Sequence, residues 1–517
     1  MSSSVDGRPL LSRAIKNASI SEVATVVFAI VVIRLIVRAI YRAYFSPLSK
    51  FPGPKLSGAT RIPYLIALYK GSIPKYVGGL HRKYGDVVRI APDEISFINP
   101  KVWKDVYGYG TKDSRMAAGS LPTKHWHRYG NPVNGHPSLL HTRGDQAHAQ
   151  TRRLFSPAFS DRALKLQEPL FQKYVNLLIH KLKEGIEEDP ERKFDMVRMY
   201  NFTTFDVMGD LTFGEPLHML SNAEYDPWVR IIFGSIKFGS RLSIIHFYPI
   251  LHHAFKTLVP ESFAKKRMEH AKFSEERVTK RLESGSDNAD IWALVLGGQD
   301  KEGGGLSRAQ MDSNSSLFMI AGTETTATLL SGMTYLLLKN PNSMKKLVEE
   351  IRGAFPSSED INMETLGQLP YLNACVKEAL RLYPPVPVGL PRLTPPDGST
   401  ICGEYVPGGC TITVPHLAMY TSEKNFREPF SFIPERWLGD QRFADDNKFA
   451  LQPFSFGPRD CLGKNMAYHE MRLILAKVLY NFDLELCPES ENWTDQEAYT
   501  LWEKHPLILN LQPAKSS

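Results

Sequence analysis

A single cysteine near the C-terminus stands in a segment suited to binding a metal. Residues 454–463 read FSFGPRDCLG, which fits F-x-x-G-x-R-x-C-x-G, and an apolar, helix-forming run follows. Gly457 and Gly463 let the backbone approach a flat ligand, while free N–H groups at the helix start favour a thiolate over a thiol. Arg459 can pair with an anionic group such as a propionate. We therefore expect Cys461 to be the axial ligand of a haem iron, against the alternative of an inert core cysteine.

A second candidate is the E-x-x-R pair of Glu378 and Arg381, on an apolar segment with helical spacing. Residues three apart share a helix face and can pair. Arg436, in the sequence FIPERW, could join them in a buried ion network, whose members are costly to remove. Taken alone, the pattern also fits an ordinary pair on a solvated helix.

A third candidate is the sequence AGTETT at 321–326, inside a long apolar segment. Gly and Thr in mid-helix lower the local helix propensity. A Thr hydroxyl that bonds back to a carbonyl can bend the helix and open a groove there. The alternative is a helix irregularity without a function.

In this order and at this rough spacing, AGTETT, EALR, PERW and FSFGPRDCLG closely resemble the cytochrome P-450 superfamily. The resemblance runs from Phe51 to the C-terminus, and the texture is most like the fungal microsomal members of secondary metabolism. It implies a mainly α fold with a minor β part (α+β), preceded by a membrane anchor helix. It also implies haem b (iron protoporphyrin IX) as the cofactor, with Cys461 as the axial ligand of the iron.

The resemblance assigns roles to further residues. Thr325 matches the threonine that assists dioxygen cleavage, Glu324 is its acidic neighbour, and both would help protons reach the distal oxygen. His148 and Arg152 stand where the family commonly carries W-x-x-x-R, and the charge of this histidine stays open. The residues expected to bind the cofactor are Cys461, Phe454, Gly457, Arg459, Gly463, His148, Arg152 and Arg392, and the structural ion network is Glu378, Arg381 and Arg436.

The implied function is a haem-dependent monooxygenase that hydroxylates or otherwise oxidises a lipophilic small molecule. Dioxygen would be the oxidant, and electrons from NADPH would arrive through NADPH–cytochrome P-450 reductase. A reductase-independent haem-thiolate isomerase or dehydratase is an alternative, although such proteins often lack the pair Glu324–Thr325. A non-enzymatic haem sensor or membrane scaffold is a third reading, against which the complete oxygen-activation set argues.

The resemblance places three segments over the distal haem face: 315–321, 386–390 and the loop 113–145. Phe318 and Val388 are expected to form apolar pocket walls, as suits a lipophilic substrate. The loop carries several histidines, including His136 and His141. A second metal site would explain them, but their irregular spacing favours surface or entrance histidines.

Length and composition favour one large catalytic domain after a short N-terminal region. The chain has 517 residues, 43% of them hydrophobic, and no repeat or long linker divides it after residue 60. We expect a tail at 1–22, a transmembrane anchor at 23–40, a basic and proline-rich hinge at 41–60, and the haem-thiolate domain at 61–517.

The anchor is marginal in length and carries Arg34 and Arg38, which could snorkel to the interface. An interfacial amphipathic helix is the alternative, and a cleaved signal peptide is the poorer reading. Basic residues after the segment favour a cytoplasmic downstream side. Together with the family resemblance, this implies a single-pass protein of the endoplasmic reticulum membrane with a cytosolic catalytic domain.

Charge and cysteine usage argue against a nucleic-acid-binding protein and against a disulfide-rich protein. A net charge of +7 is mild for this size, and no basic run interleaves with aromatics, so nucleic acid is not an expected partner. Five cysteines, odd in number, do not make a disulfide framework. Lys464 and Arg459 flank Cys461 and could help an acidic reductase to dock.

Periodicity predicts the principal elements. Helices are expected at 72–84, 146–155, 168–187, 261–282, 307–340, 343–355, 363–366 and 372–382, strands at 86–90, 94–98 and 411–414, and an exposed loop at 284–305.

Overall fold

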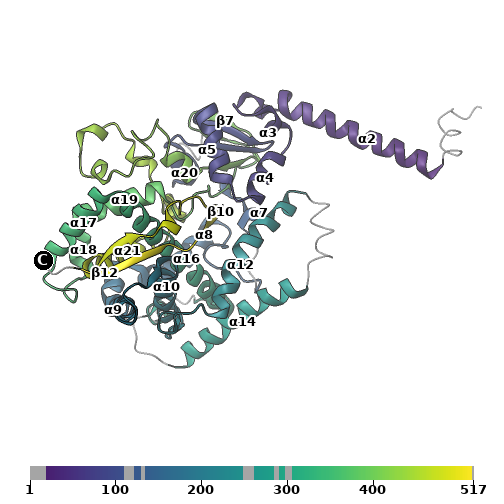
Figure 1. The fold of residues 1–517 in the computed structure, drawn as a ribbon. Coiled ribbons are helices and arrows are strands. Elements are labelled where there is room, and N and C mark those ends of the chain that lie inside the picture. The colour runs from purple at the N-terminus through teal and green to yellow at the C-terminus, as the bar shows by residue number, and fades with distance from the viewer. Residues whose placement is uncertain are drawn as a thin grey trace, which may run out of the picture.

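The computed structural model describes residues 19–109, 121–129, 134–248, 261–284, 290–296 and 305–514. Over these ranges the chain is mainly helical with small sheets, which confirms the expected fold class. Helices form most of the body, and the first described helix, α2 (Ile20–Ile40), projects away from it (Figure 1).

Helix α2 has the length and composition of a membrane-spanning helix. Together with the π-helical turn Tyr41–Phe45 it forms a 26-residue segment. An 18-residue part of this segment has a mean hydropathy of 2.5 and no buried side chain, whereas Ala43 in the turn is buried. The helix begins before the expected residue 23 because Ser19 and Glu22 form a capping box. The expected hinge at 41–60 contains two short helical turns and α3 (Lys55–Ala59).

The other described α-helices are α4 (Ile62–Tyr69), α5 (Ile73–Tyr84), α7 (Trp126–Tyr129), α8 (Asp145–Phe155), α9 (Asp161–Glu188), α10 (Met196–Phe213), α11 (Met219–Asn222), α12 (Pro227–Leu242), α14 (Glu261–Glu283), α15 (Ile291–Leu296), α16 (Arg308–Leu338), α17 (Pro341–Ala354), α18 (Met363–Gln368), α19 (Pro370–Leu382), α20 (His416–Tyr420) and α21 (Lys464–Asn481).

The largest described sheet has the strand order β1-β2-β8-β5-β3. Its strands are β1 (Val87–Ala91), β2 (Glu94–Phe97), β8 (Thr411–Thr413), β5 (Arg392–Leu393) and β3 (Thr123–Lys124). Only β2 and β8 pair in parallel, and the β3–β5 register sets Lys124 directly opposite Arg392.

Three smaller sheets use mostly C-terminal residues. They are β4 (Lys193–Asp195), β12 (Ile508–Pro513) and β9 (Phe482–Leu486); β6 (Ser399–Ile401) and β7 (Glu404–Val406); and the hairpin of β10 (Glu497–Tyr499) and β11 (Leu501–Glu503).

The long helix α16 runs through the core and packs against α10, α14, α19 and α21. Its two interior glycines permit this packing. A Cβ at Gly322 would lie 2.8 Å from the Met208 Sδ of α10, and one at Gly332 would lie 2.1 Å from the Tyr383 ring. The backbone stays α-helical through AGTETT, so Gly322 serves helix contact there rather than a break in the helix.

The predicted helices correspond to observed ones, with differences at their ends. Helix α9 starts at Asp161, seven residues before the prediction, because Ser160 caps it and Pro169 is tolerated inside it. Helix α10 has no counterpart among the predictions, since almost all of its residues are buried and it lacks an apolar stripe. Within the expected loop 284–305, residues 285–289 and 297–304 lie outside the described ranges, and the apolar piece between them is α15.

Candidate active site

The cysteine segment is fixed by a close backbone crossing. Gly457 has φ +81°, and a Cβ there would come within 1.9 Å of the Tyr107 carbonyl oxygen. Another residue would meet both backbone strain and a steric clash. Four residues later the Cys461 N–H donates to the Phe454 carbonyl at 2.9 Å. Gly463 then provides the N-cap of α21, so the cysteine lies on a turn just ahead of a helix, as its sequence predicts.

Cys461 is an exposed residue, although many protein atoms surround its thiol. This burial raises the pKa of Cys461 to about 11, and the Gly463 backbone N–H opposes the rise. The Gly463 N–H therefore favours the thiolate, as expected, but in the protein alone desolvation has the larger effect. A coordinated metal ion reverses this balance, since it deprotonates a ligating thiol outright.

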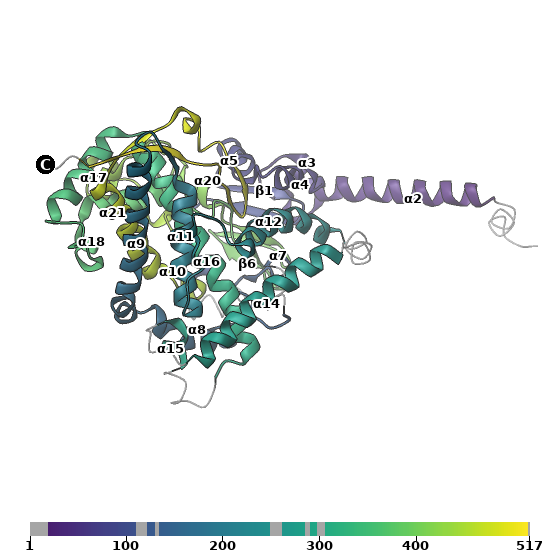
Figure 2. The same cartoon turned by 60° about the horizontal axis from the view of Figure 1, so that its bottom comes forward.

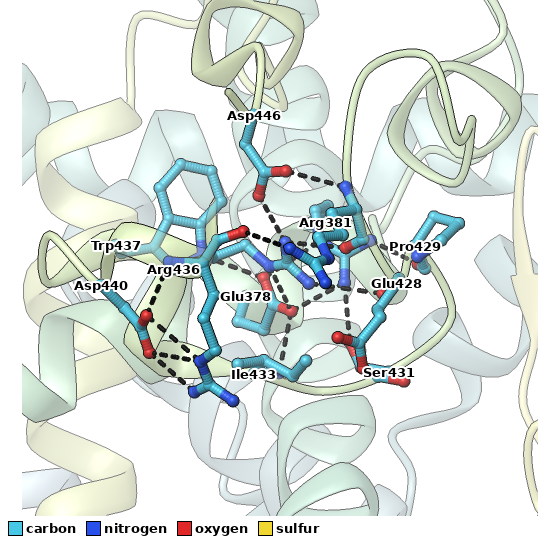
Figure 3. Close-up of polar contacts among 12 residues, drawn as sticks. Glu378, Arg381, Glu428, Pro429, Ser431, Ile433, Arg436, Trp437, Asp440 and Asp446 are labelled. Atoms are coloured by element: carbon cyan, nitrogen blue, oxygen red, sulfur yellow. Dashed lines mark hydrogen bonds and ion pairs between the residues drawn. The ribbon is translucent and has the colours of Figure 1, made fainter. Parts of the chain in front are cut away.

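Behind this segment, a fully buried ion network joins α19 to the loop before the cysteine (Figure 3). Arg381 donates from Nε and Nη2 to both Glu378 oxygens, at 2.9 and 2.7 Å, and Arg436 Nε donates to Glu378 Oε1 at 3.0 Å. All three side chains have 0% exposure. The structure thus brings together the three residues that E-x-x-R and PERW single out.

Two further residues belong to the network, although the sequence analysis did not assign them to it. Asp446 forms an ion pair with Arg436 Nη1, which balances the two arginines with two carboxylates. Trp437 Nε1 donates to Glu378 Oε2 at 2.9 Å. Its position directly after Arg436 could have indicated this role, whereas Asp446 needs the loop to fold back.

The network extends to the cysteine segment through Tyr420. Arg381 Nη1 donates to the Tyr420 carbonyl at 3.0 Å, and the Tyr420 hydroxyl accepts from the Gln452 N–H at 3.1 Å. Gln452 lies two residues before Phe454. Phe454 is partly buried, and its ring centroid lies 5.1 Å from that of Tyr468 on α21.

A second charged cluster contains more cations than carboxylates. Lys124 on β3, Arg392 on β5 and Arg459 before the cysteine interact electrostatically, and Lys124 and Arg392 are 7% and 4% exposed. Lys124 donates to the Leu140 carbonyl at 2.7 Å and Arg392 to the Tyr129 hydroxyl at 3.0 Å, and among the described residues neither forms an ion pair. Burial, helped by Arg392 and Arg459, lowers the pKa of Lys124 to about 7.

Arg459 also organises the loop ahead of α8. It donates to the carbonyls of Thr142 and Gly144, at 3.1 and 2.9 Å, and pairs with Asp145, whose side chain is 90% exposed. Lys124, which sequence reasoning missed, carries no motif. Only the two-residue pairing of β3 with β5 sets it beside Arg392.

His148 and Arg152 lie on α8 but face different partners. Arg152 donates to the carbonyl and carboxylate oxygens of Asp460, at 2.7 and 2.6 Å, and so supports the residue next to Cys461. Burial, followed by the charges of Arg459, Lys124 and Arg152, lowers the pKa of His148 to about 4. In the protein alone, this shift favours the neutral imidazole near neutral pH.

On α16, the neighbours Glu324 and Thr325 differ in their surroundings. Thr325 is half-buried, and its hydroxyl donates back to the Ala321 carbonyl at 2.8 Å. Glu324 is 3% exposed and forms an ion pair with Lys504, a residue with no sequence signal. Successive residues of a helix point about 100° apart, which lets one residue meet the C-terminal hairpin while the next does not.

Parts of the expected distal pocket can be located. Phe318 packs edge-on against Phe155 and Phe159, with ring centroids 5.1 and 5.5 Å apart, and is 7% exposed, so it is largely core rather than open wall. Val388 is half-buried. Residues 113–120 and 130–133 of the expected entrance loop lie outside the described ranges. Within the described ranges, no group of three or more His, Cys, Asp or Glu side chains is arranged to hold a metal.

The comparisons with known proteins agree with this arrangement. The family model for cytochrome P450 matches residues 56–511. The cytochrome P450 monooxygenase efuB of Hormonema carpetanum is 50% identical, with 93% of this chain and 94% of that protein covered. The cytochrome P450 monooxygenase FUM2 of Gibberella moniliformis is 48% identical over 92% of this chain and all of that protein. The monooxygenase lcsI of Purpureocillium lilacinum is 43% identical, with 94% of each covered.

A mainly helical body with a cysteine turn ahead of α21 and an intact E-x-x-R network is the architecture of a haem-thiolate protein. With the family model matched over most of its length, the chain belongs to the cytochrome P450 family. It is a monooxygenase, an oxidoreductase that uses molecular oxygen, similar to fungal enzymes of secondary metabolism.

The ion network predicts a large loss of stability on removal of one charge. Glu378→Gln leaves Arg381 and Arg436 buried with only Asp446 to balance them. We expect a loss of about 3–5 kcal/mol in the free energy of unfolding, the usual cost of breaking a buried pair. Thermal unfolding of the detergent-solubilised protein measures it.

Asp440→Asn is the matched control, since it removes the ion pair of Asp440 with the exposed Arg442. Exposed pairs contribute at most about 1 kcal/mol. Equal unfolding temperatures for the two variants would contradict the structural importance of the network.

Proposed function

We propose that this enzyme holds haem b on Cys461 and oxidises a lipophilic small molecule in secondary metabolism. Dioxygen is the oxidant, and NADPH–cytochrome P-450 reductase supplies electrons. The observation that carries the proposal is the partly unpaired cation cluster of Lys124, Arg392 and Arg459. This cluster lies close to the turn that carries Cys461 and precedes α21. Buried cations without carboxylates are costly, and a haem brings two propionate carboxylates.

The residues present fit that cofactor. Cys461 is an exposed residue on a turn, and Gly457 lets that turn pack closely against the Tyr107 backbone, which fixes its position. Lys124, Arg392 and Arg459 would hold the propionates through charge-assisted hydrogen bonds, and neutral His148 can donate one more. Arg152 holds Asp460 and so also steadies the turn beside Cys461.

Bound haem supplies the oxygen-activating chemistry, and the protein supplies its setting. Phe454 limits water near the sulfur, and Gly463 directs its N–H toward it, which tunes electron donation. On the other side, the Thr325 hydroxyl is assigned to hand protons toward the reacting oxygen, with Glu324 as the acid that resupplies them.

The membrane setting follows from α2. Its apolar side chains anchor the chain in the endoplasmic reticulum membrane, and Arg34, Arg38 and Arg42 keep the catalytic domain cytosolic. Helix α4 lies near the base of the anchor helix α2 (Figure 2). Lipid covers the exposed apolar residues of α4, including Ile62 and Ile66. A lipophilic substrate then reaches the protein from the bilayer.

Lys124→Met tests the cation cluster through haem retention. We expect haem affinity to fall about tenfold or more, because a charge-assisted hydrogen bond contributes about 1.5–3 kcal/mol. Partition of haem between the enzyme and apomyoglobin measures the change. Lys165→Met, which removes a surface lysine paired with Glu364, is the control and should leave partition unchanged.

The difference in haem affinity between wild type and Lys124→Met should depend on pH in one direction. The pKa of Lys124 is about 7 in the protein itself, and bound propionates would raise it. Haem binding therefore takes up a proton above that pH. The advantage of wild type over Lys124→Met is largest below about pH 7 and shrinks as the pH rises. An advantage that grows with pH would contradict the assignment.

Turnover with NADPH and reductase tests the function itself. We expect Thr325→Ala to keep its haem but to release peroxide, with product per NADPH lowered by at least about tenfold, because a positioned proton donor commonly contributes about 100-fold or more. Thr325→Ser, which retains a hydroxyl, should remain largely coupled. Product and peroxide are measured against NADPH consumed.

Two results would speak against the proposal. Full coupling in Thr325→Ala would remove the proton-delivery role of this hydroxyl. Product formed equally without NADPH and reductase would instead fit an isomerase or dehydratase.

A further inference from the structure

A buried ion pair joins the acidic residue of α16 to a lysine near the C-terminus. Lys504 directly follows β11, and its Nζ contacts Glu324 Oε1. The two side chains are only 4% and 5% exposed. The same ammonium group donates to the Thr328 hydroxyl at 2.8 Å, one turn further along the helix. Glu324 is thus held by a residue about 180 positions away in the sequence.

The pair is deeply desolvated and only partly satisfied. Glu324 Oε2 is buried and has no hydrogen-bond partner among the described residues. Burial raises the pKa of Glu324, while Lys504 and the Thr328 hydroxyl oppose the rise and Glu503 adds to it. The hydroxyls of Tyr225 and Tyr383 also face this charge. Lys504 is therefore the cation that offsets desolvation here.

The backbone that carries Lys504 is fastened on both sides. Trp502 stacks on Tyr383 with centroids 4.9 Å apart, and its Nε1 donates to the Pro384 carbonyl at 2.8 Å. On the other side, Lys237 of α12 pairs with Glu497 and Glu503, at 3.2 and 3.6 Å. The hairpin therefore presents Lys504 to α16 from a fixed position rather than from a loose terminus.

We propose that Lys504 is a positioning residue for proton delivery, which fixes the orientation and the charge of Glu324. The inference rests on the proposed function, in which Glu324 resupplies the proton that Thr325 passes on. A relay carboxyl must both accept and release its proton. A buried carboxylate that loses its cation becomes neutral instead, and a carboxyl that stays protonated cannot release.

Lys504→Met therefore has two expected effects. At neutral pH, infrared difference spectroscopy should show the carbonyl band of a buried, protonated carboxyl that wild type lacks, and Glu324→Gln in the same background should remove it. The pH optimum for product per NADPH should move to higher pH by about one unit or more, because buried carboxyls without a partner shift by up to several units.

The controls separate charge from packing. Lys504→Arg keeps the cation and should restore the wild-type spectrum and most of the pH profile. Lys504→Gln keeps an N–H donor for Thr328 but not the charge. It replaces Lys504→Met as the test if Lys504→Met folds poorly, and the same two effects are expected of it. Lys477→Met removes another buried lysine, bound to Asn176 at 2.6 Å, and should show neither effect.

A Lys504→Met protein without the carboxyl band and with the wild-type pH profile overturns the proposal. The proposal is also overturned if the one effect of Lys504→Met is a lower unfolding temperature, because the ion pair would then be purely structural. The infrared readout needs no turnover. Failure of the monooxygenase function would appear separately, as the absence of NADPH-dependent product from wild type.

Discussion

The structure depends on the pairing of its buried charged side chains. Behind the cysteine turn, two arginines and two carboxylates are buried together, and the balanced set is fully hydrogen-bonded. Such a set is rigid because each member would be costly to leave unpaired. Arg381 donates a hydrogen bond to the Tyr420 carbonyl, and the Tyr420 hydroxyl accepts one from the Gln452 N–H. These two bonds connect the rigid network to the segment that carries the cysteine turn.

In the candidate active site, by contrast, two buried charges are left without partners of opposite charge among the described residues. Lys124 and Arg392 are buried without carboxylates, Cys461 has a raised pKa, and His148 is forced to be neutral. The two buried cations cost stability in the protein alone, and the haem proposed as cofactor would bring two carboxylates to them. Local conflicts of this kind are expected at functional sites. The same contrast applies on α16, where Glu324 is balanced by Lys504 and Thr325 is left half-buried.

Much of this could be predicted from the sequence, for reasons that are local. The cysteine turn is encoded by Gly457 and Gly463 within one segment, and Glu378 and Arg381 meet because they lie on one helix turn. The long helices follow from periodicity and caps. The fold class and the family likewise follow from the four motifs and were confirmed by the structure and the comparisons.

The rest could not be predicted, because it depends on contacts between distant segments. Asp446 reaches Arg436 through a folded-back loop, Lys124 meets Arg392 through a strand pair of two residues, and Lys504 meets Glu324 through a hairpin. Helix α10 was missed because it is buried on all sides and has no amphipathic period. The desolvation of the Cys461 thiol could not be predicted either, because it is a property of the fold and not of the turn.

The most direct test of the central claim is the carbon-monoxide difference spectrum of the reduced, membrane-bound enzyme, with wild type, Cys461→Ser and Cys402→Ser compared. The account predicts a strongly red-shifted Soret band in wild type and Cys402→Ser, and its loss in Cys461→Ser. A folded, haem-loaded wild type without that band, or a Cys461→Ser protein that keeps it, would contradict thiolate ligation by Cys461.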